Sequence, residues 1–450
     1  MKIKKVKWNN HPVLGDLVLN FTNAAGVAFD NIVFAGENGT GKTSILETIG
    51  NFLNIGSFEF FEYIEYEVAG NTYTAVQPQN PHATIRDFYD RLDVNGQRTA
   101  LHTNRNNNRD AIAADNLDIR NHGCIFSKAR ADYKTVAVES IKTSQLDIEK
   151  YNKDDDDNFT VLKQLIVDID SQDNAAYADH AKHNLGNPMD WALFYPTSKT
   201  YRFKNSFDTF FGNIQFDRVE DQPGEKRILF TKNGTAIPID NLSTGEKQVV
   251  FRGVYLLKNM NSLGGAIVLI DEPELSMHPK WQRKVLQYYK GLFTDAAGQK
   301  AQLFFASHSE NVLKTALSDK TSNLVIVLNA AANGIITARQ IVSPWVLPTI
   351  SDAETSYLAF DLVSSDFHIA LYGYLQFREH RNVKGTDDYI LAHPLYDPAI
   401  HRRPSPGLGN TTYETLPTLI RNSIDHPNPA VTYTEEELRI STNLLIGICR

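Results

Sequence analysis

A glycine-rich octapeptide near the start of the chain constrains its fold more than any other segment of the 450 residues. Residues 36–43 read Gly-Glu-Asn-Gly-Thr-Gly-Lys-Thr and fit the pattern G-x-x-x-x-G-K-[ST]. An apolar, strand-like segment at 31–34 precedes them, and helical periodicity over 42–54 follows them. A glycine loop between a strand and a helix is typical of α/β proteins, so we predict an α/β fold built on a mixed sheet.

The octapeptide also predicts a binding site for nucleotide phosphates. Its glycines let backbone N–H groups close around phosphate oxygens, and the N-terminus of the following helix adds partial positive charge. Lys42, on a loop that we expect to be open to solvent, would reach the β- and γ-phosphates, and the Thr43 hydroxyl would bind Mg²⁺. The residues expected to contact ATP in this segment are Gly36, Asn38, Gly39, Gly41, Lys42, Thr43 and Ser44.

A second motif places two carboxylates at the end of a buried strand. Residues 266–270 are Ala-Ile-Val-Leu-Ile, and Asp271 and Glu272 follow them directly. In open α/β sheets, ligands bind at the carboxyl ends of the strands. We therefore expect Asp271 to hold Mg²⁺ and Glu272 to act as the general base that polarises the attacking water.

A third motif precedes this acidic strand end. Residues 241–248 read Asn-Leu-Ser-Thr-Gly-Glu-Lys-Gln, and Ser243 with Glu246 forms a capping box, which by itself predicts only a helix start. In its position, however, the motif resembles the LSGGE/LSGGQ signature of ABC-type ATPases, whose phosphate loop Asn38 also matches. Residues 271–279 resemble the Walker B and D-loop run of the SMC-, RecF- and OLD-like branch of that family.

The resemblance to ABC-type ATPases implies a division of roles between two copies. In that family two heads sandwich two ATP molecules, and the signature of one head contacts the γ-phosphate held by the other. His308, in Ala-Ser-His-Ser after a predicted strand, resembles the switch histidine. The resemblance implies that Ser243 and Gly245 act in trans, and that the groups acting in cis are Lys42, Thr43, Asp271 and the catalytic residues Glu272 and His308. Glu246 is also expected among the ATP-binding residues. In one departure, Ser127–Arg130 occupy the place of the Q-loop glutamine.

The same resemblance sets the expected domain layout. It predicts an ABC-type head over residues 1–340 with a helical and polar insertion at about 95–200. Within the insertion, the residue pattern predicts a helical and polar segment over 139–190, interrupted by a solvated acidic turn at 153–158. A mostly helical region is predicted at 341–450, with a proline-rich loop near 401–407.

Within the ATPases, the chain most resembles the compact enzymes of bacterial anti-phage systems, the Septu PtuA family. This implies ATP and Mg²⁺ as cofactors, a homodimer or higher homo-oligomer, and an HNH-type nuclease as the partner protein. No nuclease domain is recognised in the chain itself, and a transporter motor is the weakest interpretation of the motifs.

Two alternatives stay open. A RecF-like DNA repair clamp would bind DNA along a basic track consisting of Lys2, Lys4, Lys5, Lys7, Arg98, Arg105 and Arg109. A HEPN-like ribonuclease effector would use Arg421 and His426, which fit the loose pattern R-x₄₋₆-H. The latter pair equally fits a capped helix end before Pro427.

The amino-acid composition further restricts what kind of protein the chain can be. Hydrophobic residues make up 42% of the chain, enough for a packed core, and the formal net charge of -8 argues against a surface that is basic throughout. Cys124 and Cys449 lie far apart in the sequence, so neither a disulfide framework nor a zinc knuckle is expected. No segment has the length and hydrophobicity of a membrane span or of a secretory leader, and we expect a cytoplasmic protein without membrane contact.

Overall fold

The computed structural model describes residues 1–79, 89–101, 122–131, 133–154, 159–186, 189–341, 345–406, 411–427 and 431–450. It consists of two compact units, residues 1–339 and 340–450. Of the residues expected to form the basic track, Arg105 and Arg109 lie outside the described residues. None of the helices in the described segments is long and apolar enough to cross a membrane.

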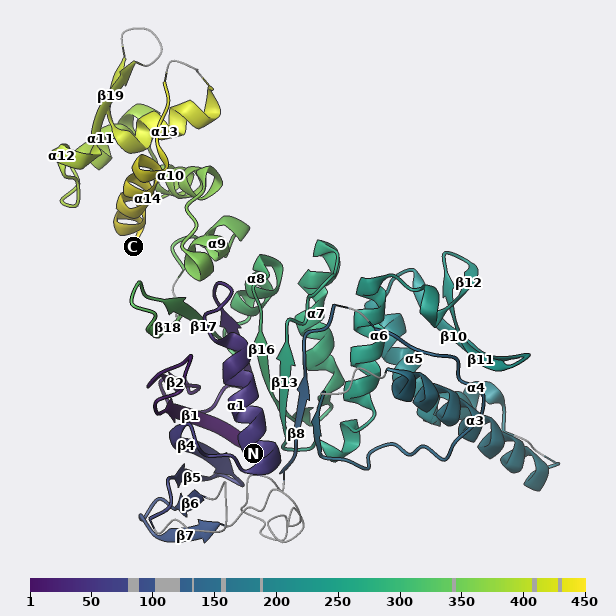
Figure 1. Cartoon of the computed structure of the whole chain (residues 1–450). Helices are drawn as coiled ribbons and strands as arrows, with labels where there is room; N and C mark the ends of the chain where they lie inside the picture. Colours follow the sequence, from purple (N-terminus) through teal and green to yellow (C-terminus); the bar gives the residue numbers. More distant parts are fainter. Residues whose placement is uncertain are drawn as a thin grey trace. The chain divides into compact units, whose positions relative to one another are not determined.

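The first unit is built on a seven-stranded sheet with the order β18-β17-β3-β16-β13-β8-β9 (Figure 1). Neighbouring strands from β17 through to β9 pair in parallel. Every residue of β3, β13 and β16 is buried, which explains their continuous apolar sequences. The strands are β3 (Asn31–Ala35), β8 (Cys124–Ser127), β9 (Tyr151–Lys153), β13 (Ile267–Asp271), β16 (Gln302–Ala306), β17 (Asn323–Ala330) and β18 (Ile336–Gln340).

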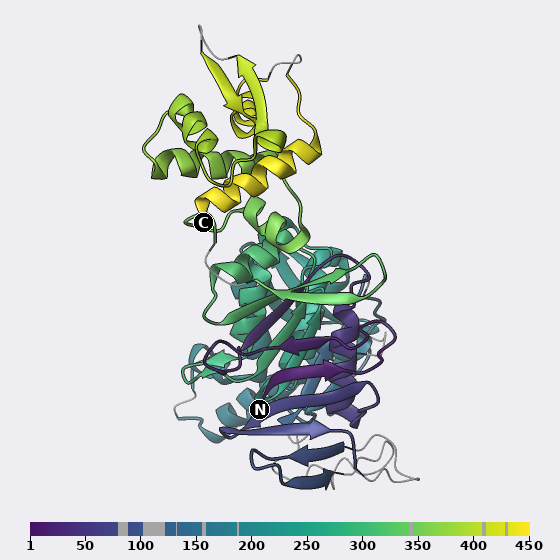
Figure 2. The same cartoon turned by 90° about the vertical axis from the view of Figure 1, so that its left-hand side faces the viewer.

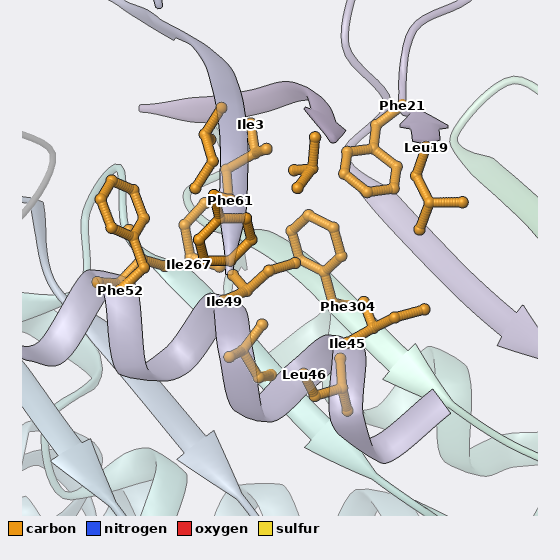
Figure 3. Packing of buried hydrophobic residues seen from close by; sticks show 14 of the residues in the cluster. Ile3, Leu19, Phe21, Ile45, Leu46, Ile49, Phe52, Phe61, Ile267 and Phe304 are labelled. Carbon is orange, nitrogen blue, oxygen red and sulfur yellow. The ribbon is translucent and has the colours of Figure 1, made fainter. Parts of the chain in front are cut away.

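Helix α1 (Lys42–Ile55) begins directly after the glycine loop and packs between this sheet and an antiparallel sheet of order β2-β1-β4-β5-β6-β7. Figure 3 shows Ile45, Leu46, Ile49 and Phe52 of α1 among apolar side chains of both sheets. Their helical spacing gives α1 one apolar face, and burial of this face orients the helix. Because the glycine loop leads directly into α1, its orientation follows that of the helix. The second sheet consists of β1 (Lys2–Trp8), β2 (Val18–Asn20), β4 (Phe61–Val68), β5 (Asn71–Val76), β6 (Tyr89–Leu92) and β7 (Arg98–Leu101).

A third part of this unit carries the signature motif. The expected helix over 139–190 is wrong at its start, because α3 begins only at Thr160. Before it, residues 139–150 are irregular and residues 151–153 form strand β9, which pairs with β8. The Lys142 backbone N–H also donates to the buried Asp168 carboxylate of α3 at 2.8 Å, so this segment uses its backbone groups in contacts other than those of a helix. The elements here are α3 (Thr160–His183), α4 (Trp191–Phe194), α5 (Lys199–Phe210), β10 (Ile214–Gln222), β11 (Glu225–Lys232), β12 (Thr235–Pro238) and α6 (Thr244–Leu257). Two further helices, α7 (Pro279–Leu292) and α8 (Glu310–Ser318), follow β13 and β16.

The second unit is mostly helical (Figure 2). It has its own core, formed mainly by residues of α10 and α14. The loop expected near 401–407 is wrong in part, because residues 402–406 form strand β19 of a hairpin. Its two prolines are compatible with the strand because a two-stranded ribbon has only edge strands. The elements are α9 (Asp352–Phe360), α10 (Ser365–Arg378), α11 (Val383–Leu391), α12 (Pro398–His401), β19 (Arg402–Pro406), β20 (Thr412–Thr415), α13 (Leu416–Asp425) and α14 (Glu435–Cys449).

Candidate ATP-hydrolysis site

The glycine loop is shaped by three glycines with positive φ angles. Gly36, Gly39 and Gly41 have φ values of 140°, 83° and 86°. A Cβ atom on Gly36 would lie 2.4 Å from the Leu328 carbonyl oxygen, so no other residue fits there. Gly41 is the N-cap of α1, and the loop therefore ends with free helix N–H groups. This arrangement is the anion-binding cradle that the sequence predicts.

Lys42 does not lie on a solvent-open loop, which corrects the expectation from sequence. It is the first residue of α1 and only 8% exposed. Its ammonium group donates to the carbonyl oxygens of Gly36 at 2.8 Å and Glu37 at 2.9 Å. Burial lowers the pKa of Lys42. The loop thus curls around its own lysine, and a phosphate group is the kind of partner that would replace these neutral acceptors with a charged one.

Thr43 and Asp271 meet across the sheet although 228 positions separate them. The Thr43 hydroxyl donates to Asp271 Oδ1 at 3.2 Å and to Oδ2 at 3.1 Å. Asp271 is the last residue of β13, and burial raises its pKa to about 6. A hydroxyl and a carboxylate are hard oxygen ligands of the kind Mg²⁺ takes beside nucleotide phosphates, so the donor set fits the ion.

Glu272 and His308 follow the ends of two adjacent parallel strands, β13 and β16. The Glu272 backbone has a φ of 42°, and its N–H donates to the Ala306 carbonyl at 2.9 Å. Its Oε1 atom lies 3.6 Å from His308 Nδ1, and both side chains are partly exposed. The two groups expected to be catalytic therefore face each other at an accessible edge of the sheet. Of the other predicted contacts, Asn38 is exposed and Ser44 is half-buried at the start of α1.

The sequence reasoning missed two buried charged residues beside this edge. Glu274 is 3% exposed, accepts from Ser307 Oγ at 2.7 Å and from the His308 N–H at 3.2 Å, and has a pKa raised by burial. Arg252, in the middle of α6, is 2% exposed and donates to backbone carbonyls next to β13. Glu274 has a signal, since it belongs to the acidic run, whereas Arg252 is hidden in an apolar helix whose buried positions surround it.

The three signature residues are not brought to the glycine loop of the same chain. Ser243 caps α6, and Glu246 completes the predicted capping box, with its Oε2 accepting from the Ser243 N–H at 2.8 Å. Glu246 also pairs with Lys232 at 2.7 Å. A Cβ atom on Gly245 would lie 2.5 Å from the Ser276 carbonyl oxygen, so this helix end presses against the D-loop. In Figure 1, strands β13 and β8 lie between α1 and α6.

The position expected for a Q-loop glutamine is occupied by the end of β8. Ser127 pairs in register with Ile270, one residue before Asp271. Its hydroxyl is buried and has no hydrogen-bond partner within the described residues. Arg130 points elsewhere and forms an ion pair with Asp154 at 2.8 Å. Arg130 thus serves local structure, and no glutamine lies among residues 127–130.

Arg421 and His426 lie in the second unit, at the end of α13. Both line a cavity of about 490 Å³ together with Ser405, Tyr413 and other residues of the hairpin and α13. Arg421 is held by an ion pair to Asp425 one turn along the helix, at 2.6 Å, and His426 is the C-cap residue. The pair therefore shares one cavity, but the arginine is tied into its own helix.

The fold and the site together define a P-loop ATPase domain of the ABC type, as the sequence resemblance implies. A family model described as "AAA domain, putative AbiEii toxin, Type IV TA system" matches residues 32–314, more than half of the chain, and the chain belongs to this family.

Individual relatives narrow the picture. The chain is 32% identical over 148 residues to the retron Vc95 probable ATPase of Vibrio cholerae serotype O1 biovar El Tor, a match covering 31% of this chain and 27% of the relative. It is 25% identical over 335 residues to the Septu protein PtuA of Bacillus thuringiensis, covering 70% and 73%. It is 29% identical to the retron Ec83 probable ATPase of Escherichia coli, covering 30% and 25%. The chain thus spans about a quarter of the length of the two retron relatives, and the resemblance to the Septu PtuA family is confirmed.

Among solved structures, the chain is similar to the SMC head domain from Thermotoga maritima, with a TM-score of 0.40 and 13% identity, covering 76% of this chain and 100% of that one. A head bound to the C-winged helix domain of ScpA also has a TM-score of 0.40, with 15% identity, covering 76% and 98%.

Proposed function

We propose that this chain hydrolyses ATP to ADP and phosphate at composite sites formed between two copies, and that the resulting change of state controls a partner effector nuclease in anti-phage defence. The observation that carries the proposal is the meeting of Thr43 with Asp271 at 3.1 Å, next to the Glu272–His308 pair at 3.6 Å. A hydroxyl, a metal-binding carboxylate, a base and an imidazole thus gather at one sheet edge, beside a cradle for phosphates.

The chemistry follows from this arrangement. Mg²⁺, held by Thr43 and Asp271, would supply charge neutralisation on the phosphates. Lys42 exchanges its two carbonyl acceptors for phosphate oxygens, and the glycine loop donates backbone N–H groups. Glu272 accepts a proton from the water that attacks the γ-phosphorus, while the bond from that phosphorus to the β–γ bridging oxygen breaks. His308, facing Glu272, lies where it can hydrogen bond to the γ-phosphate or to the attacking water.

The position of the signature supports sites that form between copies. Ser243 and Gly245 lie at the start of α6, where Gly245 packs against Ser276 of the D-loop, and strands β13 and β8 lie between this helix and α1 in Figure 1. A nucleotide in the cradle of one chain would reach a serine hydroxyl and a helix N-terminus from a second chain. Closure of the pair around ATP would then be the signal that reaches the partner.

Mixing two inactive variants tests the composite site. Ser243→Arg removes the serine contact with the ATP that the neighbouring chain holds. Lys42→Ala abolishes ATP binding at the variant's own glycine loop. In a mixed dimer one site carries both lesions and the other carries neither, so ATPase activity should return, up to about half of the parental value. Lys42→Ala mixed with Glu272→Gln is the matched control, because two cis lesions leave one defect in each site and no activity returns. Failure of the first mixture in a demonstrated heterodimer would contradict the trans role of Ser243.

The partner is a separate part of the proposal. The relatives bear the names of Septu and retron systems, and the resemblance implies an HNH-type nuclease beside the ATPase. The mass of the complex purified from its native operon tests this: a complex no heavier than multiples of this chain would argue against a bound effector.

The structure supports the two alternative functions, a DNA clamp and a ribonuclease, to different degrees. For a DNA clamp, several of the proposed track residues already have carboxylate partners: Lys2 with Asp30, Lys4 with Glu67, Lys7 with Glu62 and Arg98 with Asp90. This leaves little net positive charge along β1 for phosphate contacts. For a ribonuclease, the cavity shared by Arg421 and His426 is the one supporting observation.

A further inference from the structure

A single buried arginine connects the signature helix with the catalytic strand end. Arg252 of α6 donates through Nη1 to the Glu272 carbonyl at 2.8 Å and through Nη2 to the Asp271 carbonyl at 2.6 Å. Nη2 also donates to the Lys128 carbonyl, directly after β8. With 2% exposure, the guanidinium is enclosed by backbone oxygens from the two segments that flank the site. Only a planar group with several fixed donors can satisfy acceptors in these different directions.

The peptide units held by Arg252 are those that aim the catalytic carboxylate. Glu272 has a φ of 42°, a conformation that residues with a side chain rarely adopt. Its N–H is fixed by Ala306 at 2.9 Å, and its carbonyl is fixed by Arg252. Such a conformation persists only where neighbours hold it in place. Arg252 is thus one of the groups that keep Glu272 directed toward His308.

The same helix touches the catalytic run a second time at its N-terminal end. Gly245 lies so close to Ser276 that an added Cβ atom would be 2.5 Å from the Ser276 carbonyl, and Ser276 itself has a φ of 59°. Helix α6 is continuous from Thr244 to Leu257, so both contacts move together with the helix. The D-loop and the base are therefore joined to one rigid element that also begins with Ser243.

We infer that Arg252 is a positioning residue that couples the two composite ATP sites. When the Ser243 end of α6 engages the ATP bound to the neighbouring chain, the helix and its arginine set the backbone of Glu272, which serves the ATP of its own chain. Occupation of one site then promotes hydrolysis in the other. This inference rests on the proposed composite sites, because without them Ser243 has no ATP to engage.

The test compares Arg252→Lys with Arg202→Lys in the full-length protein. Arg202 also binds a backbone carbonyl of α6, that of Leu257 at 3.0 Å, and pairs with Asp147 at 2.9 Å, but it belongs to neither catalytic strand end. We expect the parent and Arg202→Lys to hydrolyse ATP with a Hill coefficient clearly above one. Arg252→Lys should bind ATP with an affinity within about threefold of the parent, lose about tenfold or more in kcat, and show a Hill coefficient near one.

The possible results separate a coupling role of Arg252 from a purely structural one. If Arg252→Lys still hydrolyses ATP cooperatively, the coupling is overturned. The coupling is also overturned if the ATP affinity of the variant falls in proportion to its kcat, because a purely structural role of Arg252 would lower both. A non-cooperative parent also overturns the coupling. In the dimer that mixes Ser243→Arg with Lys42→Ala, the intact site has no occupied neighbour, so the coupling expects activity to return without cooperativity and clearly below half of the parental rate. Returned activity keeps the composite site whatever Arg252→Lys does, and if none returns, both ideas fail. Should Arg252→Lys not fold, Arg252→Gln takes its place, and the same loss of cooperativity with retained ATP binding is expected of it.

Discussion

Two buried carboxylates, Asp387 in the second unit and Glu274 in the first, have very different surroundings. In the second unit, Asp387 accepts hydrogen bonds from the Glu414 and Thr415 N–H groups at 2.9 and 3.0 Å and from the Thr415 hydroxyl at 2.7 Å. In the first unit, Glu274 is about as buried, yet its Oε2 atom has no hydrogen-bond partner among the described residues. The structural carboxylate is fully satisfied, whereas the one beside the predicted ATP site is not.

The other groups at the sheet edge follow the same contrast. Asp271 has a raised pKa, Lys42 has a lowered one, and Glu272 is held at a positive φ. In the second unit, Arg421 lies in an ordinary ion pair within one helix. Shifted pKa values and strained backbone angles cluster at ligand-binding and catalytic sites. Groups whose hydrogen bonds or ion pairs are complete are typical of structural positions. Three substitutions test whether the contrast is real.

The largest effect is expected at Glu272. Glu272→Gln keeps the shape of the side chain but removes the base, so kcat should fall about 10²–10⁴-fold. ATP affinity should stay within about threefold, because Lys42, Thr43 and Asp271 are untouched, and ATP should accumulate in closed dimers. Single-turnover hydrolysis and equilibrium nucleotide binding measure the two quantities. Turnover at the parental rate would show that another group is the base.

The sequence is informative where local chemistry decides the structure. The glycine loop, the capping box at Ser243 and the apolar strand before Asp271 each form as predicted, because glycine freedom, side-chain capping and continuous burial act over a few residues. The meeting of Thr43 with Asp271 was expected because parallel strands end at one edge.

What the sequence did not reveal depends on tertiary contacts. Arg252 lies in an apolar helix, and its importance comes from carbonyls 19 and 20 positions away that only the folded sheet brings near. Lys42 is buried because the loop curls over it, which no local pattern signals. The same holds for the segment before α3, where residues 151–153 pair with β8 as strand β9 and do not continue a helix.

A medium effect, with a defined pH dependence, is expected at Asp271. Burial raises its pKa from 3.8 to about 6, so the folded chain binds this proton more tightly than the unfolded chain. The associated stability is complete below about pH 4 and is lost as the pH rises through 6. In the absence of nucleotide, Asp271→Asn should therefore stabilise the fold at pH 7.5 by up to about 3 kcal/mol, and by little at pH 4, as measured by denaturant unfolding.

Asp319→Asn is the control with the opposite sign. Although burial opposes it, hydrogen bonds from Ser322, Thr321 and Lys290 lower the pKa of Asp319 to about 2. Its ionised form stabilises the fold above about pH 4, and this contribution is lost as the pH falls through 2, so the substitution should destabilise the fold at pH 7.5. Asp271→Asn should also lose Mg²⁺-dependent nucleotide binding. Equal stability of Asp271→Asn and the parent at pH 7.5 would remove the evidence that this carboxylate is held at a cost.

The smallest effect is expected at Arg421, where the contrast predicts a structural group. The Arg421–Asp425 ion pair spans one helical turn, at 2.6 Å, with side chains 22% and 36% exposed. Such pairs contribute only a few tenths of a kcal/mol, so Arg421→Ala should lower the free energy of unfolding by less than about 1 kcal/mol and change the ATPase rate by less than about twofold. A double-mutant cycle with Asp425→Ala measures the contribution of the pair.

The same substitutions test the ribonuclease alternative. Arg421→Ala, Asp425→Ala and His426→Ala are compared in an assay of RNA cleavage by the purified chain. Because Asp425 does not line the cavity, its removal should not matter to a ribonuclease, whereas Arg421→Ala and His426→Ala would abolish cleavage. If RNA cleavage is detected and both substitutions abolish it while Asp425→Ala does not, the cavity is an effector site, and a satisfied ion pair would no longer mark a group as structural.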